Sequence, residues 1–242
     1  PQIWRVRKAE ANNWLKSSKI IVTSHYGFSY EKADENSQHI SDICSGDLLL
    51  YKGEKNGFYE VEYPDGERTA YVKKDAAAPF DEWLASRKPT GENIIKTAKT
   101  LMGLPYLWGG TSAKGLDCSG FTKLVYFLNG IVLPRDASQQ VLTGTAIDTE
   151  NGWENCQAGD LLFFGHVDEE TGEEHIGHVA IYIGDNEFIH SGGILQINSF
   201  EKDSDNFSEY SYKSYIKARR IINSIHKNEI QLISNNKFYK GI

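Results

Sequence analysis

Short strands are predicted for the first part of the chain, because apolar residues alternate or run together there over only a few positions. The segments with this pattern, rich in β-branched and aromatic residues, are 19–25, 46–54, 57–66 and 68–75. Lys55-Asn56-Gly57 and Pro64-Asp65-Gly66 separate some of them and have the composition of tight turns. Short strands at such close spacing predict a small antiparallel barrel.

The pattern changes at residues 75–92, where three alanines, Pro79 and Pro89 interrupt it around one short amphipathic turn. This composition is typical of a linker. We therefore expect a first domain over residues 1–78 and a second domain over residues 79–242.

Helical spacing of apolar residues follows this linker. Residues 90–103 predict a helix with Thr90 as its N-cap and Gly103 as its stop. A second helix is predicted to begin at Asp117 and to end near Gly130. Further on, the pattern changes to strands, at residues 160–166, 177–184, 186–193 and 215–222. Helices followed by an antiparallel sheet predict an α+β domain.

Composition and charge exclude some classes of function. The 242 residues include 26 Lys and Arg against 33 Asp and Glu, a formal net charge of −7. Phosphate binding needs clustered positive charge and no basic run is present, so no nucleic acid partner is expected. The longest strongly apolar stretch, residues 124–133, is far shorter than the roughly 20 residues of a membrane helix. We therefore expect a soluble body without a membrane span.

Met102 is the only methionine of the chain. We therefore expect a processed product, a trimmed clone or a renumbered fragment, and a removed export signal would account for the missing initiator. The compartment is unknown from the sequence, with the cell envelope or the outside of the cell favoured over the cytoplasm.

The tripeptide Cys-Ser-Gly occurs twice, so the residues around each cysteine are needed to predict which thiol is reactive. Cys44 leads into a strand and is interpreted as a half-buried structural residue, and Cys156 as a packing residue. Cys118 follows a favoured N-cap residue and begins a helix, so its sulfur is expected at the positive end of the helix dipole. The pKa of a thiol falls there, which favours the attacking thiolate, and Gly120 would leave room for a substrate backbone. A structural role for Cys118 stays open at this point, and the odd number of cysteines argues against a disulfide framework.

A cysteine nucleophile needs a base, and residues 177–193 offer one. This segment is predicted to form a β-hairpin that turns at residues 184–186. With a three-residue loop, His190 lies opposite Ala180 and diagonal to His178 on one face of the ribbon. His178 would then be the base, and His190 would fix its tautomer. A loop of two or four residues would place the two histidines on opposite faces.

Several motifs, in the same order, resemble those of the NlpC/p-sixty superfamily of papain-like cysteine peptidases, which hydrolyse peptidoglycan stem peptides. They are YLWGGTSAKGLDCSGF (106–121), LPRDASQQ (133–140), AGDLLFF (158–164), GHVAIYIG (177–184) and FIHSGG (188–193). The resemblance implies a papain-like α+β catalytic domain in which Cys118 is the nucleophile. It also implies His178 as the base and His190 as the polar third residue.

The same motifs imply further residues around the substrate. Tyr106 resembles the tyrosine that lines the active site and helps to stabilise the oxyanion, and the Cys118 backbone N–H is a sensible second donor. Trp108, Ser119 and Arg135 lie in the matching motifs and are assigned to substrate binding. By themselves, the aromatic residues of this segment would more often be core residues.

The upstream barrel resembles the bacterial SH3-like domains that are often fused to this superfamily. In the branch that resembles γ-D-glutamyl-L-diamino acid endopeptidases, the substrate has a free N-terminal L-Ala followed by γ-D-Glu. Acidic groups hold the ammonium in that branch, and Asp117 and Asp136 are the matching candidates, with helix capping and a surface turn as their alternative roles. Ala137 stands where the branch often has serine, with Ser138 one place on. There is room for one barrel only, and residues 1–16 could be a remnant or a brace.

We therefore expect a monomeric cysteine peptidase that needs no cofactor and no metal. It would hydrolyse the γ-D-Glu to diamino acid bond of stem peptides or muropeptide fragments, with lysine or diaminopimelate as the diamino acid. Two other classes stay open. One is a zinc hydrolase that uses His166, His175 and His178, and the other is a cell-wall-binding module without catalysis.

Overall fold

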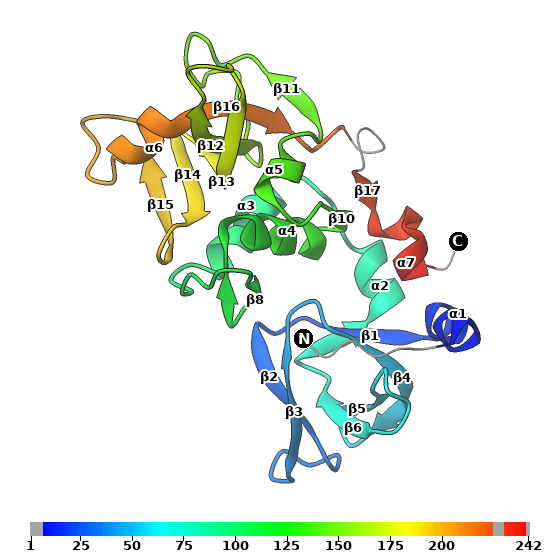
Figure 1. Ribbon diagram of the computed structural model, residues 1–242. Coiled ribbons are helices and arrows are strands. Elements are labelled where there is room, and N and C mark those ends of the chain that lie inside the picture. Colours follow the sequence, from blue (N-terminus) through cyan, green and yellow to red (C-terminus); the bar gives the residue numbers. More distant parts are fainter. Residues whose placement is uncertain (1–6, 225–229, 241–242) are drawn as a thin grey trace. The chain divides into compact units, whose positions relative to one another are not determined.

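The chain forms two compact units in the computed structural model, which describes residues 7–224 and 230–240 (Figure 1). Of the described residues, unit 1 contains 7–87 and 233–240, and unit 2 contains 88–224 and 230–232. Each unit has its own buried apolar core.

Unit 1 is built on a seven-stranded antiparallel sheet with the order β3-β2-β6-β5-β4-β1-β7. Its strands are β1 (Lys19–Val22), β2 (Tyr26–Tyr30), β3 (His39–Cys44), β4 (Leu48–Lys55), β5 (Phe58–Glu62), β6 (Thr69–Lys73) and β7 (Ala77–Pro79). Its helices are α1 (Lys8–Lys16), α2 (Phe80–Ala85), the short 3-10 helix η1 (Ile233–Asn235) and α7 (Lys237–Lys240). The predicted all-β region is confirmed, whereas its membership of the SH3-like family stays a prediction.

The turn between β4 and β5 follows the predicted chemistry. Asn56 and Gly57 both have positive φ angles, 49° and 81°, which asparagine and glycine tolerate best. By contrast, β2 and β3 were not predicted. Most of their side chains are partly or fully exposed, so these strands carry no continuous apolar pattern.

The segment interpreted as a linker is ordered within unit 1. Strand β7 pairs with β1, with Ala77 opposite Val22, and α2 follows directly with Phe80 and Trp83 buried. The two compact units therefore divide between Arg87 and Lys88, later than the boundary near residue 78 that we predicted.

Unit 2 combines helices with a six-stranded antiparallel sheet of the order β11-β16-β12-β13-β14-β15 (Figure 1). The strands of this sheet are β11 (Thr145–Ile147), β12 (Leu161–Val167), β13 (Glu174–Gly184), β14 (Glu187–Ser191), β15 (Leu195–Ser199) and β16 (Tyr215–Arg220). The helices are α3 (Gly91–Thr100), α4 (Cys118–Leu128), α5 (Ala137–Gln140) and α6 (Glu209–Ser214). Two small strand pairs, β8 (Thr111–Ser112) with β9 (Gly115–Leu116) and β10 (Ile131–Val132) with β17 (Gln231–Leu232), complete it. The predicted α+β class is confirmed.

Both faces of this sheet are covered, which explains why β12 is apolar at consecutive positions. Leu161 and Phe163 belong to the core that includes residues of α3 and α4. Leu162 and Phe164 belong to a second cluster on the other face, together with Phe200. Burying each such side chain contributes on the order of 1.5–3 kcal/mol, so the sheet is a firm support for residues that lie on it.

The β13–β14 hairpin has the register that we predicted. Ile181 lies opposite Ile189 and Tyr182 opposite Phe188, as a three-residue loop requires, and an irregularity follows between Tyr182 and Gly184. The two histidines of this hairpin therefore lie on one face of the ribbon.

No helix in the described ranges has the length and apolar character to cross a membrane.

Candidate active site

Helix α4 begins where the sequence predicted. Asp117 has an extended backbone (φ −85°, ψ 178°), and its side chain accepts the Gly120 N–H at 2.6 Å. This N-cap makes Cys118 the first residue of the helix, with its side chain largely buried. The sulfur thus lies at the helix N-terminus, next to backbone N–H groups that have no partner within the helix.

Gly120 has a different role from the one we expected. A Cβ atom at this position would lie 2.0 Å from the carbonyl oxygen of Gly110. That same carbonyl accepts the Asp117 N–H at 3.1 Å. The space beside Gly120 is filled by the chain's own loop, so our expectation that it leaves room for a substrate backbone is wrong. Gly120 instead lets the Trp-Gly-Gly segment close onto the start of α4.

Asp117 is fully engaged inside the chain. Arg135 donates from Nη1 to Oδ1 at 3.1 Å and from Nη2 to Oδ2 at 2.6 Å, and Gly109 N–H donates to Oδ2 at 2.9 Å. Arg135 Nη1 also donates to Ser119 Oγ at 3.0 Å. Burial alone would raise the pKa of Asp117, but Arg135 and the backbone N–H groups outweigh it and hold this pKa below its ordinary value. The carboxylate is therefore charged and already paired.

Asp136, the other predicted ammonium ligand, has a more open carboxylate. Its side chain is 62% exposed, and its Oδ1 lies 4.0 Å from Arg135 Nη1. Ala137 and Ser138 both line the cavity that the Cys118 thiol also lines, so Ser138 lies in the region where the family's serine was expected.

The Cys118 thiol lines a cavity of about 200 Å³. Tyr106, Trp108, Ser119 and Asp136 line the same cavity, so the structure brings together most of the residues that the sequence assigned to the substrate. Tyr106 is 38% and Trp108 is 86% exposed, so the interpretation of these two as core aromatics is wrong.

The resting thiol is less acidic than we predicted. Burial raises the pKa of Cys118, and this effect outweighs the hydrogen bond that Val179 N–H donates to the sulfur. The charge of Asp117 raises this pKa further. Our expectation of a lowered thiol pKa is therefore wrong, because the helix start that should stabilise the thiolate is buried and faces a carboxylate.

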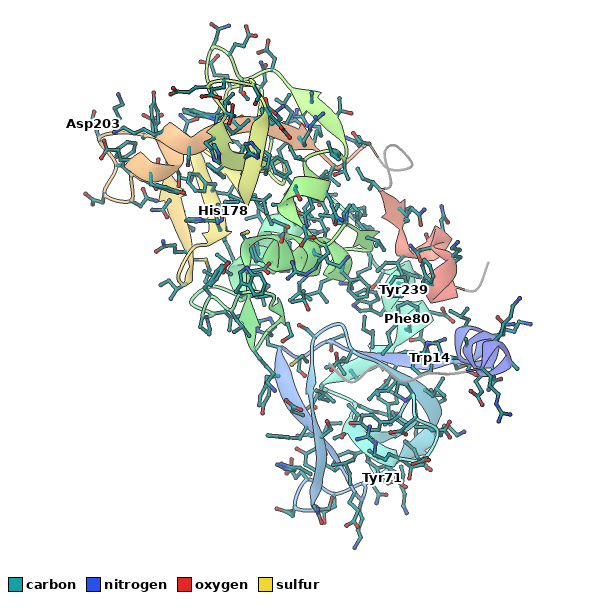
Figure 2. All side chains as sticks on the ribbon, in the orientation of Figure 1. Trp14, Tyr71, Phe80, His178, Asp203 and Tyr239 are labelled. Carbon is teal, nitrogen blue, oxygen red and sulfur yellow. The ribbon has the colours of Figure 1, made fainter. Side chains whose placement is uncertain are left out.

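The hydrogen bond from Val179 also locates the thiol. Val179 directly follows His178 on β13, and its N–H bonds to the Cys118 sulfur. Val179 precedes Ile181, the residue at which the pairing of β13 with β14 starts. Strand β13 packs against both α4 and α5, and Figure 2 shows His178 on this side of the sheet. Cys118 therefore lies beside the backbone next to the predicted base.

A chain of hydrogen bonds extends from His178 across the neighbouring strands. His178 Nε2 is 2.8 Å from His190 Nδ1 on β14, and His190 Nε2 is 2.8 Å from Asn198 Oδ1 on β15. The Asn198 side-chain N–H donates to the carbonyl oxygen of Asn206 at 2.9 Å. We call this chain the His178 relay.

The end of the relay determines which nitrogen of His178 is free. The Asn206 carbonyl can only accept, so the Asn198 amide must turn its N–H towards Asn206 and its oxygen towards His190. His190 Nε2 then carries a hydrogen, and neutral His190 accepts from His178 through Nδ1. Neutral His178 consequently has its lone pair on Nδ1.

The two histidines of the relay are neutral near pH 7. Burial, followed by the charge that His190 can carry, lowers the pKa of His178 to about 3. Burial also lowers the pKa of His190, although the hydrogen bond to Asn198 opposes this shift. The resting site therefore holds a neutral thiol and two neutral imidazoles rather than an ion pair.

Sequence reasoning missed Asn198. In the β14–β15 ladder His190 lies opposite Gln196, so Asn198 is at the diagonal position on the same face. This is the spacing that joined His178 to His190. Extending the hairpin logic across the turn at Gly192 and Gly193 would have found it.

The zinc alternative lacks a ligand set in the part of the chain that the structure describes. No three His, Cys, Asp or Glu side chains lie together there in a group that could hold a metal ion. His166 and His175 stack on each other across β12 and β13 with ring centroids 4.9 Å apart, whereas His178 bonds to His190.

The other two cysteines belong to other parts of the fold, Cys44 to unit 1 and Cys156 to the second cluster of unit 2. Cys44 is buried at the end of β3, more deeply than expected, and Cys156 packs in the cluster on the far face of the unit 2 sheet. Burial raises the pKa of Cys156 to about 12. None of the three cysteines forms a disulfide.

A cysteine at a helix start, packed beside a strand that carries a hydrogen-bonded histidine pair, is the arrangement of a papain-like cysteine peptidase. The NlpC/P60 family model matches residues 103–230. The chain therefore belongs to the NlpC/P60 family, as the sequence motifs indicated.

Similar proteins agree with this family. The chain is 42% identical over 172 residues to the gamma-D-glutamyl-L-lysine dipeptidyl-peptidase of Bacillus cereus. This alignment covers 71% of this chain and 49% of that protein. Identity to the protein of the same name from Bacillus subtilis is 34%, over 71% of this chain and 53% of that protein. The chain thus spans about half the length of these curated relatives.

A solved structure is similar to most of this chain. The crystal structure of an NlpC/P60 family protein from Bacillus cereus aligns with a TM-score of 0.71 at 29% identity. The alignment covers 89% of this chain and 67% of that one. This similarity confirms the fold class.

Proposed function

We propose that this chain is a cysteine peptidase that cleaves the bond between γ-D-Glu and the diamino acid of peptidoglycan stem peptides. The observation that carries the proposal is the His178 relay, which orients a base one residue before Val179, whose N–H bonds to the Cys118 sulfur. The names of the relatives, gamma-D-glutamyl-L-lysine dipeptidyl-peptidase, support the choice of bond. We further propose that the stem peptide has a free N-terminal L-Ala.

The first chemical step forms the acyl-enzyme. Nδ1 of His178 accepts the thiol proton as the Cys118 sulfur attacks the γ-carbonyl of D-Glu, and a carbon–sulfur bond forms. The backbone N–H of Cys118 and the hydroxyl of Tyr106 stabilise the oxyanion. His178 then gives its proton to the departing amine, and the carbon–nitrogen bond breaks.

The second step releases the acyl group. Water enters where the amine has left, His178 Nδ1 accepts its proton, and the oxygen attacks the thioester carbon. The sulfur departs and takes the proton back. In both steps His190 supports the positive charge that develops on His178, because its Nδ1 accepts the Nε2–H.

The neutral resting pair has a consequence for this mechanism. Because the pKa of the thiol is raised and that of His178 is lowered, proton transfer between them is unfavourable in the empty site. The proton therefore moves as the carbon–sulfur bond forms, when the oxyanion donors stabilise the product of the transfer.

The two predicted carboxylates, Asp117 and Asp136, differ in whether they are available to bind the free amino terminus of the substrate. Asp117 is paired with Arg135, whereas Asp136 is exposed in the cavity of Cys118. We propose that Asp136 receives the ammonium of L-Ala and that Asp117 organises the start of α4. The envelope location and the monomeric state stay predictions.

The proposed function is tested by incubating L-Ala-γ-D-Glu-L-Lys with the protein and analysing the products by mass spectrometry. We expect L-Ala-D-Glu and free lysine from the parent and from Cys156→Ala, and intact tripeptide from Cys118→Ala. Acetylating the N-terminal amine should reduce kcat/KM by about tenfold or more if the ammonium is recognised. Intact tripeptide with the parent, or cleavage by Cys118→Ala, would refute the peptidase proposal.

A further inference from the structure

Unit 2 contains a second cavity that the proposed mechanism has not used. Its volume is about 460 Å³, within the range of small-molecule sites. The relay residues His178, His190 and Asn198 form one wall. Phe207 and Ser211, from the segment after β15 and from α6, line it as well.

This cavity adjoins the cavity of Cys118 at one residue. Gly177 lines both of them and is exposed. A Cβ atom built on Gly177 would meet no atom within 4 Å. No other group therefore covers the backbone of Gly177 on the side where a side chain would project. An extended peptide can pass over Gly177 on this side from one cavity to the other.

The proposed chemistry assigns the two ends of such a peptide. The carbonyl carbon must lie at the Cys118 sulfur, which lines the smaller cavity. The leaving nitrogen must lie at His178, which lines the larger one. Everything attached to that nitrogen therefore continues into the larger cavity.

We propose that the larger cavity binds the amine side of the cleaved bond, that is, the diamino acid residue of the stem peptide. This inference rests on the proposed function and adds to it the site that holds the leaving group. The side chain of the diamino acid lies against Phe207, and its polar end lies among amide and hydroxyl groups.

The lining also defines the selectivity. Among the described residues that line this cavity, none is Asp, Glu, Lys or Arg. Lysine ends in an ammonium alone, whereas diaminopimelate adds a carboxylate to that end. A lining without formal charge has no means to prefer one of them strongly, so the site accepts both diamino acids.

Gln196 is the side chain through which this selectivity can be changed. It lines the cavity from β15, is half-buried, and its amide has no hydrogen-bond partner among the described residues. A charge placed at this position acts directly on the end of the diamino acid side chain. Gln157 is an exposed glutamine of the same unit that does not line the cavity, and it serves as the matched control.

The test measures kcat/KM for two tripeptides, L-Ala-γ-D-Glu followed by either L-lysine or diaminopimelate. For the parent we expect the two values to agree within about threefold. Gln196→Glu should shift their ratio by about fivefold towards lysine, and Gln196→Lys should shift it by a similar factor towards diaminopimelate. Gln157→Glu and Gln157→Lys change the net charge equally and should leave the ratio unchanged.

A second variant tests the passage over Gly177. Gly177→Val fills it, so hydrolysis of both tripeptides should fall by about a hundredfold, whereas alkylation of Cys118 by iodoacetamide should stay within about twofold of the parent. The alkylation rate also shows that the variant is folded around its thiol.

The outcomes separate the two proposals. If both Gln196 variants cleave both tripeptides with the parental ratio, the cavity does not hold the diamino acid, although the peptidase proposal stands. If the parent cleaves neither tripeptide, the peptidase proposal itself fails. Full hydrolysis by Gly177→Val would also overturn the inference, because the substrate would then not cross that residue.

Discussion

Asn198 is a neutral residue in a place where many hydrolases have a carboxylate. A carboxylate beside an imidazole stabilises its cationic form and raises its pKa. The Asn198 amide accepts the same hydrogen bond without a charge, which is consistent with a pKa of about 3 for His178. Asn198 therefore acts as a positioning residue that selects tautomers and leaves both histidines neutral.

Replacing Asn198 by leucine should remove this selection. We expect the imidazole ¹⁵N resonances of His178 to change from a single Nε2–H tautomer to a mixture, and kcat to fall by about 10- to 100-fold. Asn198→Asp keeps the acceptor, so the tautomer should be retained while the pKa of both histidines rises. The checks are long-range ¹H–¹⁵N NMR spectra and pH–rate profiles.

The control for this prediction is Asn93→Leu, the same change at a half-buried residue of α3 whose side-chain N–H donates to the Lys88 carbonyl oxygen. It should leave the imidazole spectrum and kcat unchanged. An unaltered His178 tautomer in Asn198→Leu would show that the relay is not oriented from β15.

Arg135 neutralises a buried charge, and its removal should be costly. Arg135→Met leaves the Asp117 carboxylate without its cation, and we expect the free energy of unfolding to fall by about 3 kcal/mol. Lys213→Met removes one partner of the exposed pair with Glu209 and should cost less than about 1 kcal/mol. Urea denaturation of the two variants distinguishes them, and equal midpoints would contradict the structural role of Arg135.

At the scale of elements, the active site depends on two glycine motifs that close on each other. The Gly110 carbonyl lies over Gly120 of α4 and accepts the Asp117 N–H, while Gly110 itself approaches the carbonyl of Gly115. The loop before the nucleophile and the helix after it are thus held by backbone contacts that no side chain can replace.

Gly120→Ala tests this contact, because intrinsic propensity and packing predict opposite results. In a free helix, alanine would stabilise by about 1 kcal/mol relative to glycine. In this chain its Cβ would lie 2.0 Å from a backbone oxygen, so we expect the opposite sign, a loss of about 2 kcal/mol or more, and at least a tenfold lower kcat/KM. Thermal denaturation and tripeptide hydrolysis are the measurements.

The matched control is Gly53→Ala in β4 of unit 1. A Cβ atom there meets nothing within 4 Å, so the change should alter stability by less than about 0.5 kcal/mol. A stabilised Gly120→Ala variant would show that the loop yields to the helix.

The elements that sequence could predict are those with local causes. The cap at Asp117 and the register of β13 with β14 follow from residue type and loop length, so the helix start and the histidine pair were predictable. The thiol pKa was not, because burial and the Asp117 charge depend on the folded surroundings. β7 and α2 were interpreted as a linker because their pairing with β1 lies far back in the chain.

At the scale of the whole molecule, the two neutral histidines of the relay couple folding to pH. The pKa of His178 is about 3 when folded, against an ordinary value near 6.5. Between these values the unfolded chain binds a proton that the folded chain does not. The stability contributed by neutral His178 is therefore complete above pH 6.5 and is lost as the pH falls below it, and His190 acts in the same direction.

The size of this effect can be measured by difference. One proton corresponds to about 1.4 kcal/mol per pH unit, so His178 alone should lower the free energy of unfolding by about 2 kcal/mol between pH 7 and pH 5. His178→Gln cannot take up this proton, and its loss of stability over the same range should be smaller than that of the parent by this amount. Urea denaturation of both proteins at both pH values is the test, and parallel pH curves for the parent and His178→Gln would mean that folded His178 takes up its proton as readily as the unfolded chain.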